Sequence, residues 1–303
     1  MKRVVTLGLA AAFAVCGIAG AQAKTVKLEY KHRKGAVDKY RMGMTMQMTM
    51  PGMPGAPSGL MLTKMTEVLT QKVLNVYPDG SAKIRFSFDK MKMKMGMPGM
   101  GRPEQSVPTR SMTMTMTMSK DGKPLKIEGL SSMMGGAGMA GMDLSQMMGQ
   151  FGSYGPFPGR PVSVGETWKQ AVPLPSFGGN VNVVSTLLAA AVAVGRESAA
   201  KIKQTYSGHF DIAEMMKAFA GATPGDAKGG EEARKAMSSM EGAMDFKGWS
   251  VTYFSPTRGK MLKTNGSVNV RMNMTMPAAA QQQGAPAQMN MVMDMDIYLR
   301  RIK

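Results

Sequence analysis

Methionine alternates with polar residues along five stretches of this chain, and this alternation is the pattern that predicts most about its structure. The stretches are Met42–Met50, Met91–Met97, Met112–Met118, Met272–Met276 and Met289–Met295, and they hold more than half of the 37 methionines. Successive side chains of a β-strand point to opposite faces of its sheet, so a repeat of two residues predicts a strand. Each stretch is therefore predicted to be a strand with one thioether face and one polar face, although methionine is a weak strand former.

In the C-terminal half, the methionines share their face with branched aliphatic residues. Val268 has the same parity as Met272–Met276, and Leu299 continues the parity of Met289–Met295. A face that carries valine, leucine and methionine together is typical of the interior side of a sheet. We therefore expect the thioether face to point inward.

The parity of the apolar positions changes once within a predicted strand. Apolar residues occupy even positions from Ile84 to Phe88, whereas the methionines of Met91–Met97 occupy odd positions. Both sets can face the same side only if one extra residue is accommodated between them. We therefore predict a β-bulge near Asp89-Lys90.

Turn sequences divide the chain into antiparallel hairpins. Glycine accepts positive φ and proline presets φ, so Pro78-Asp79-Gly80, Lys120–Lys123, Gly195-Arg196-Glu197 and Ser255–Gly259 each predict a turn between two strands. The expected strands cover residues 24–33, 39–50, 60–77, 82–97, 112–118, 124–128, 181–194, 199–207, 248–254, 260–276 and 289–302. The segments 51–59 and 98–108 are rich in glycine and proline and are predicted loops.

The predicted fold is mainly β, a large curved antiparallel sheet or half-barrel with two short helices and a Gly/Met-rich lid. Residues 131–155 lack the two-residue repeat and form the expected connector or lid. The helices are predicted at 211–220 and 231–244, inside a helical insertion that spans 211–245. Residues 277–288 are of low complexity and are expected to form a disordered loop. Residues 24–303 are otherwise expected to form a single domain.

The first 23 residues have the pattern of a cleaved signal peptide. Lys2-Arg3 is basic, Val4–Ala19 is apolar, and Ala21–Ala23 fits a small-x-small cleavage site. Lipidation at Cys16 is a less favoured alternative, because Val15 stands where a small residue is usual. We therefore expect an exported protein of the bacterial periplasm or the extracellular space. Since the chain has 1 cysteine, which precedes the expected cleavage site, the mature protein would form no disulfide.

The chain is strongly basic, with 38 Lys and Arg against 20 Asp and Glu and a formal net charge of +18. Such a charge favours anionic surfaces such as lipid headgroups or polyanionic envelope polymers, and it also keeps a protein soluble without any such partner. The basic residues are scattered along strands and aromatic residues make up 6% of the chain, so nucleic acid is not an expected partner.

Two motifs resemble a known group of proteins. They are PFPGRPVSVGETW at Pro156–Trp168 and VTYFSPTRGKMLK at Val251–Lys263. With the order of strand pairs, they resemble a broad, poorly characterised family of exported bacterial β-rich proteins. The resemblance implies a large curved antiparallel sheet, loosely similar to the half-barrels of periplasmic lipoprotein carriers. It implies no activity, and the methionine runs are not part of it.

Residues suited to catalysis or to binding hard metals are sparse. His32 lies in a basic strand and His209 at a strand end, and these are the only histidines. No nucleophile motif or phosphate-binding loop is present, and the carboxylates are dispersed, so we expect no enzymatic activity. The chain also lacks a paired-histidine motif and an EF-hand loop, which argues against zinc and calcium sites.

The preferred function is the binding of an apolar or amphipathic envelope ligand, a lipid or acyl chain, on the methionine face. Methionine is flexible and polarizable, so a surface lined with it adapts to varied apolar shapes. The expected partners are an apolar or anionic lipid-like molecule and, as a further candidate, a membrane surface, with no cofactor. The predicted ligand-binding residues are Met42, Met44, Met46, Met48, Met112, Met114, Met116, Met272, Met274, Met291 and Met293.

Two other functions remain open for the same face. Thioethers bind Cu(I) without deprotonation, so the chain is alternatively a methionine-rich Cu(I)-binding protein. The Cu(I) ligands would then come from Met42, Met44, Met46, Met48, Met91, Met93, Met95 and Met97. The third function is a structural envelope protein without a ligand, whose methionines react with oxidants.

Overall fold

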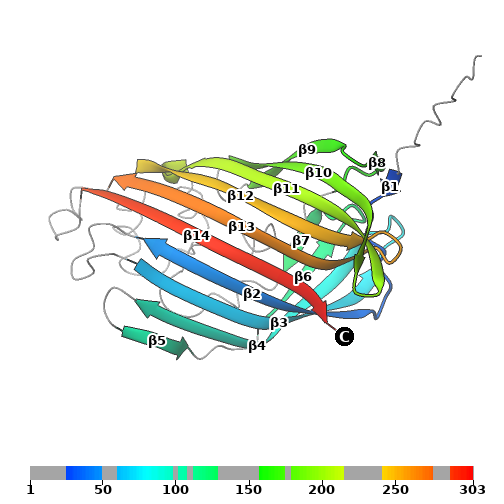
Figure 1. The fold of residues 1–303 in the computed structure, drawn as a ribbon, viewed down its shortest axis with the longest axis horizontal. Coiled ribbons are helices and arrows are strands. Elements are labelled where there is room, and N and C mark those ends of the chain that lie inside the picture. Colours follow the sequence, from blue (N-terminus) through cyan, green and yellow to red (C-terminus); the bar gives the residue numbers. More distant parts are fainter. Residues whose placement is uncertain are drawn as a thin grey trace, which may run out of the picture.

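The computed structural model describes residues 25–49, 60–97, 102–107, 112–128, 157–174, 179–214, 241–275 and 287–302, and these form two antiparallel sheets (Figure 1). The larger is a 12-stranded sheet in the order β7-β6-β4-β3-β2-β14-β13-β12-β11-β10-β9, with β5 paired to β4 outside this path. Its strands are β2 (Val37–Thr49), β3 (Leu60–Val76), β4 (Ala82–Met97), β5 (Arg102–Val107), β6 (Met112–Met118), β7 (Pro124–Glu128), β9 (Thr167–Leu174), β10 (Gly179–Val194), β11 (Glu197–Asp211), β12 (Glu241–Ser255), β13 (Lys260–Thr275) and β14 (Gln288–Ile302). A 2-stranded sheet pairs β1 (Thr25–Lys27) with β8 (Pro161–Ser163).

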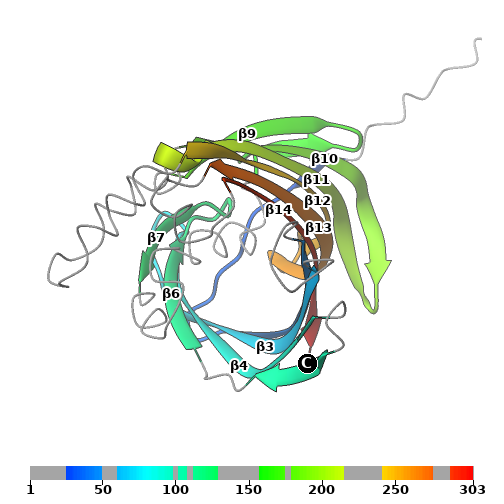
Figure 2. The ribbon, with the colours of Figure 1, turned by 90° about the vertical axis from the view of Figure 1, so that its left-hand side faces the viewer.

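The large sheet curls strongly about its own interior (Figure 2). In the described part of the chain, the edge strands β7 and β9 do not pair with each other, so the sheet remains open. The prediction of a large, curved antiparallel sheet is therefore confirmed. None of the helical residues described form a segment that is long and apolar enough to cross a membrane.

The four predicted turns are confirmed, and all of them meet at one end of the sheet, called here the hairpin end. Gly80, Gly122, Gly195 and Gly259 have φ values of 83°, 92°, 61° and 61°, which glycine adopts without strain. At Gly259 a side chain would also collide with the backbone of Lys31, which donates an N–H to the Gly259 carbonyl at 3.2 Å. The opposite end of the strands is called the loop end, because β2 and β3, and likewise β13 and β14, are joined there by the long segments 50–59 and 276–286, which lie outside the described residues.

The predicted β-bulge in β4 is confirmed. Thr66 of β3 pairs with Lys92 of β4, and Val68 of β3 pairs with Asp89 of β4. Two residues along β3 thus correspond to three residues along β4. The extra residue on β4 restores the inward parity, because Phe88 is buried and Met93 is half-buried on the same side.

The predicted first strand at 24–33 is wrong beyond residue 27. Only Thr25–Lys27 pairs as a strand, and the following residues cross the interior at the hairpin end (Figure 2). Leu28 and Tyr30 are buried in the core there, and the Tyr30 N–H donates to the Lys120 carbonyl at 2.7 Å. Leu28 and Tyr30 alternate with less buried residues, as in a strand, but this segment packs across the sheet instead of pairing within it.

Two further boundaries need correction. The predicted loop at 98–108 contains β5, which pairs with the part of β4 beyond the range covered by β6 and so satisfies backbone groups that would otherwise form a free edge. The predicted helix at 231–244 is wrong over 241–244, which belong to β12 and pair with both β11 and β13. Strand pairing on both sides here overrides local helix propensity.

The helix predicted at 211–220 is observed as a single turn at residues 212–214. Asp211 caps this turn, since its Oδ1 accepts N–H groups from Ala213 at 2.7 Å and Glu214 at 3.2 Å. The rest of the predicted insertion at 211–245, the lid at 131–155 and most of the loop at 277–288 lie outside the described residues.

Two clusters of buried side chains form the core. The larger fills the hairpin end, where Phe254 of β12 lies 5.2 Å from Tyr30 and 4.7 Å from Phe157, measured between ring centroids. The second lies against β10–β14 and contains Phe210, Phe246 and several methionines. Aromatic side chains are therefore most numerous at the hairpin end, and methionine is the most frequent residue of the second cluster.

Candidate functional site: the methionine-lined inner face

Methionines from neighbouring strands stand directly opposite one another on the inner face. One row crosses three strands, because Met44 of β2 pairs with Met65 of β3, which pairs with Met93 of β4. A second row, nearer the loop end, consists of Met61, Met48 and Met293. Opposed residues of an antiparallel pair have Cβ atoms about 4.5–5.5 Å apart, so the thioethers in each row are close enough to pack against each other.

Burial of the methionines is graded along the strands. Met114, Met116 and Met261 are buried near the hairpin end, whereas Met48 and Met289 at the loop end are half-buried. No methionine whose side chain the structure describes is exposed, while most of the polar residues between them are. The inward direction of the thioether face is thus confirmed, and its half-buried methionines extend from Met42 and Met91 to the loop end.

Most of the predicted ligand-binding residues are brought together. Met42, Met44, Met46 and Met48 of β2, Met291 and Met293 of β14, and Met272 and Met274 of β13 lie on three adjacent strands. Met114 and Met116 instead lie in the packed core of the hairpin end, and the side chain of Met112 lies outside the described residues.

The residues of the Cu(I) alternative lie on two strands, β2 and β4, that are not adjacent. Met91, Met93 and Met95 of β4 lie next to β3, whose methionines separate them from those of β2. The side chain of Met97 is outside the described residues. Sequence reasoning missed Met61 and Met65, although they share odd parity with Leu69 and this parity could have identified them.

The inner face also carries a carboxylate that sequence reasoning missed. Glu67 of β3 is 2% exposed, stands opposite Met42, and neither of its carboxylate oxygens has a hydrogen-bond partner among the described residues. The next inward pairs along the strands involve Leu69 with Tyr40 and Phe88, so Glu67 lies where the methionine face meets the aromatic core. Burial without a partner raises the pKa of Glu67 to about 7.

A second polar atom on the same face is also unpaired. The Thr63 hydroxyl is buried between Met46 and Met95, its partners on the adjacent strands, and it forms no hydrogen bond within the described structure. A buried polar atom without a hydrogen-bond partner destabilises the folded state, so two such residues on one strand are unusual in a closely packed core. Thr63 and Glu67 are therefore the polar groups on this face that a ligand could pair with.

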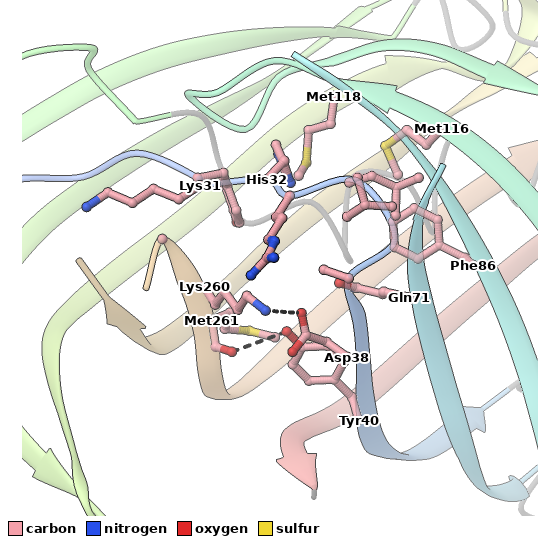
Figure 3. A pocket seen from close by; sticks show the side chains of 16 residues that line it. Lys31, His32, Asp38, Tyr40, Gln71, Phe86, Met116, Met118, Lys260 and Met261 are labelled. Carbon is pink, nitrogen blue, oxygen red and sulfur yellow. Dashed lines mark hydrogen bonds and ion pairs between the residues drawn. The ribbon is translucent and has the colours of Figure 1, made fainter. Parts of the chain in front are cut away.

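A small cavity of about 50 Å³ lies at the hairpin end (Figure 3). At its rim, the Lys260 ammonium lies 2.6 Å from the Asp38 carboxylate, and the Tyr40 hydroxyl donates to the Met261 carbonyl at 3.3 Å. Burial, followed by the charge of Lys260, lowers the pKa of His32 to about 4, so this side chain is neutral at physiological pH. A volume of this size holds a few water molecules, and we assign the cavity to closure of this end.

Within the described ranges, no group of three or more His, Cys, Asp or Glu side chains is placed to hold a metal ion. Thioether ligands form a separate class and are considered below.

Comparisons with known proteins identify no family. No protein-family model matches the chain, and no curated protein matches its sequence. Among solved structures, DynF from the dynemicin biosynthesis pathway of Micromonospora chersina is similar at a TM-score of 0.23 and 9% identity, over 91% of this chain and 85% of that one. A likeness at this TM-score carries no argument about function.

Proposed function

We propose that this protein is a non-enzymatic binding protein of the bacterial envelope, which holds an apolar or amphipathic ligand such as a lipid or acyl chain against its methionine face. The observation that carries the proposal is the incomplete burial of this face, which is packed at the hairpin end and consists mostly of half-buried methionines from the middle of the strands to the loop end. The signal-peptide pattern and the resemblance to exported β-rich proteins similar to lipoprotein carriers support the proposed location.

The chemistry of the face suits such a ligand. Unbranched thioether side chains repack around apolar groups of different shapes, and here they share the face with Val270 and Ile297. The unpaired Thr63 hydroxyl and Glu67 carboxyl would supply hydrogen-bonding groups for the polar part of an amphipathic molecule. An apolar wall with a few polar groups is the usual composition of a small-molecule binding site.

The second candidate, Cu(I) binding, is favoured by one specific observation. Three thioethers stand side by side on adjacent strands in the row Met44, Met65 and Met93. Side chains of this length can bring three sulfur atoms to one ion, and soft sulfur ligands prefer Cu(I). The same row is compatible with an apolar ligand, so an experiment must separate the two.

Two single substitutions at neighbouring positions of β2 test the proposal. Gln47 and Met48 are nearly equal in size, and their side chains point to opposite faces of the sheet. Met48→Gln places an amide on the inner face and is expected to weaken binding of a fluorescent acyl-chain probe about tenfold, which corresponds to roughly 1–2 kcal/mol for burying an unpaired amide. Gln47→Met changes the exposed outer face and should leave the affinity unchanged. Fluorescence titration measures both, and equal affinities in all three proteins would refute the proposal.

The variant Met48→Leu separates the two candidate functions. Leucine is apolar and of similar volume, so acyl-probe affinity is expected to stay within about threefold of wild type. Cu(I) affinity, measured against a competing chelator, would fall if the Met48 sulfur is a ligand. Tight Cu(I) binding that this variant weakens, with no acyl-probe binding in any protein, would favour the copper function instead.

A further inference from the structure

A row of basic side chains crosses the outer face of the sheet near the hairpin end. Lys201 of β11 pairs with Tyr253 of β12, followed across the sheet by Lys263 of β13, Arg300 of β14 and Arg41 of β2. Their chain neighbours Ala200, Phe254, Leu262, Leu299 and Tyr40 are buried. The row therefore points outward, and with strands about 4.8 Å apart it extends over about 19 Å.

The four cations of this row have no acidic partner in the described part of the protein. Two of them lie over the ring of Tyr253, whose centroid is 6.0 Å from the Lys201 ammonium and 5.6 Å from the Lys263 ammonium. Like charges directly opposite each other on adjacent strands repel, so the row is destabilising until an anion neutralises it.

Two other basic residues at the hairpin end, in contrast, form ion pairs with acidic side chains. Arg301 reaches Asp38 at 3.0 Å and Glu197 at 3.2 Å, and Lys260 reaches Asp38 at 2.6 Å. The charges of Lys260 and Arg301 are thus balanced by nearby carboxylates. The outer row, only one residue away from Arg301 along β14, is left without them.

Two exposed aromatic rings and a shallow hollow complete this surface. The hollow, of about 540 Å³, is lined by Arg41, Lys263, Arg300 and Tyr298. Tyr298 is 44% exposed, and its ring occupies the space that a side chain at Gly43 would fill, so it lies flat over β2. Trp249 of β12, also on the outer face, is 46% exposed.

We propose that this outer surface docks on a membrane that carries anionic lipid headgroups. The unpaired cations would contact several phosphate groups at once, since the row is too long for one, and Trp249 and Tyr298 would enter the interfacial layer where amphipathic rings are favoured. A soluble polyanion would use the cations but gain little from the exposed rings, which is why the membrane is the partner proposed. Docking through the outer face does not depend on what the inner face binds.

Co-sedimentation with vesicles tests the proposal. The purified protein is expected to bind vesicles that contain phosphatidylglycerol and not vesicles of pure phosphatidylcholine. The triple variant Arg41→Gln, Lys263→Gln and Arg300→Gln should lose about 100-fold in affinity, as expected for three basic residues at an anionic surface. A matched control removes the same charge from exposed residues away from the row and consists of Lys92→Gln, Lys169→Gln and Arg271→Gln.

The control triple should retain affinity to within about threefold, because screening limits the effect of distant charges. An equal loss in both triple variants would overturn the proposal, since only net charge would then matter. The acyl-probe titration should be unchanged in both, so failure of docking is distinguishable from failure of the inner-face proposal.

Tryptophan fluorescence separates a membrane from a soluble polyanion. Trp168 is buried, so an emission shift on adding vesicles reports mainly on Trp249. A blue shift with phosphatidylglycerol vesicles, and reduced vesicle binding by Trp249→Gln, are expected. Binding to dextran sulfate as tight as to the vesicles, with no emission shift on either, would overturn the proposal in favour of a soluble polyanion.

Discussion

Replacing Glu67 by glutamine is expected to stabilise the protein by about 3 kcal/mol at pH 8 and to change stability little at pH 4. Burial raises the pKa of Glu67 to about 7 in the folded protein, against an ordinary value of 4.5 for a carboxyl in the unfolded chain. The folded state therefore holds the proton more tightly, and the stability associated with the protonated form is lost as the pH rises from 4.5 through 7. The cause is the removal of an unpaired carboxylate from water.

Urea unfolding of wild type and Glu67→Gln at the two pH values measures this effect. Glu241→Gln is a matched control, because Glu241 is an exposed carboxylate on β12. It should leave stability nearly unchanged at both pH values. A loss of stability in Glu67→Gln at pH 8 would contradict the assignment and would show that the carboxylate has a favourable partner.

Replacing Phe254 by alanine is expected to cost about 3–5 kcal/mol, the usual range for removing a fully buried phenylalanine. Phe254 is 0% exposed, and its ring contacts both Tyr30 and Phe157. These three residues come from β12, from the segment that crosses the interior and from the segment before β8. The substitution would therefore loosen the closure of the hairpin end as well as leave a cavity.

Thermal or urea unfolding measures the loss, and proteolysis near residues 28–36 should become faster. Trp249→Ala on the same strand is the control, because Trp249 is 46% exposed and points outward. It should cost less than about 1 kcal/mol, as surface substitutions generally do. Similar losses in the two variants would contradict the described packing of the hairpin end.

The alternation of apolar and polar positions predicted much of the fold, because each strand of this sheet has one inner and one outer face. The bulge near Asp89-Lys90 could be predicted since the apolar residues before and after it occupy positions of opposite parity. The turns could be predicted from glycine and proline. These are local properties, which a sequence carries directly.

The missed features depend on contacts between distant parts of the chain. Leu28 and Tyr30 alternate like a strand, and only the presence of Phe254 and Phe157 opposite them shows that the segment crosses the interior. Likewise, β5 is a strand because part of β4 is left without a partner there. Residues 241–244 look helical until their pairing with both β11 and β13 is known.

The two candidate surfaces differ in how far a sequence can reveal them. The methionine runs identified most of the inner face, and Met61, Met65 and Glu67 share a parity that could have extended it. The outer basic row could not be predicted, because Arg41, Lys201, Lys263 and Arg300 become neighbours only through the register of distant strands.

Methionine oxidation by peroxide, followed peptide by peptide with mass spectrometry, tests the central claim most directly. Sulfoxide formation requires access to the sulfur atom, so its rate reports burial. We expect Met114, Met116 and Met261 to react slowest, Met48 and Met289 to react at intermediate rates, and a bound acyl probe to slow only the second group. Oxidation of both groups at the rate of the urea-unfolded chain would contradict an inward-facing methionine surface.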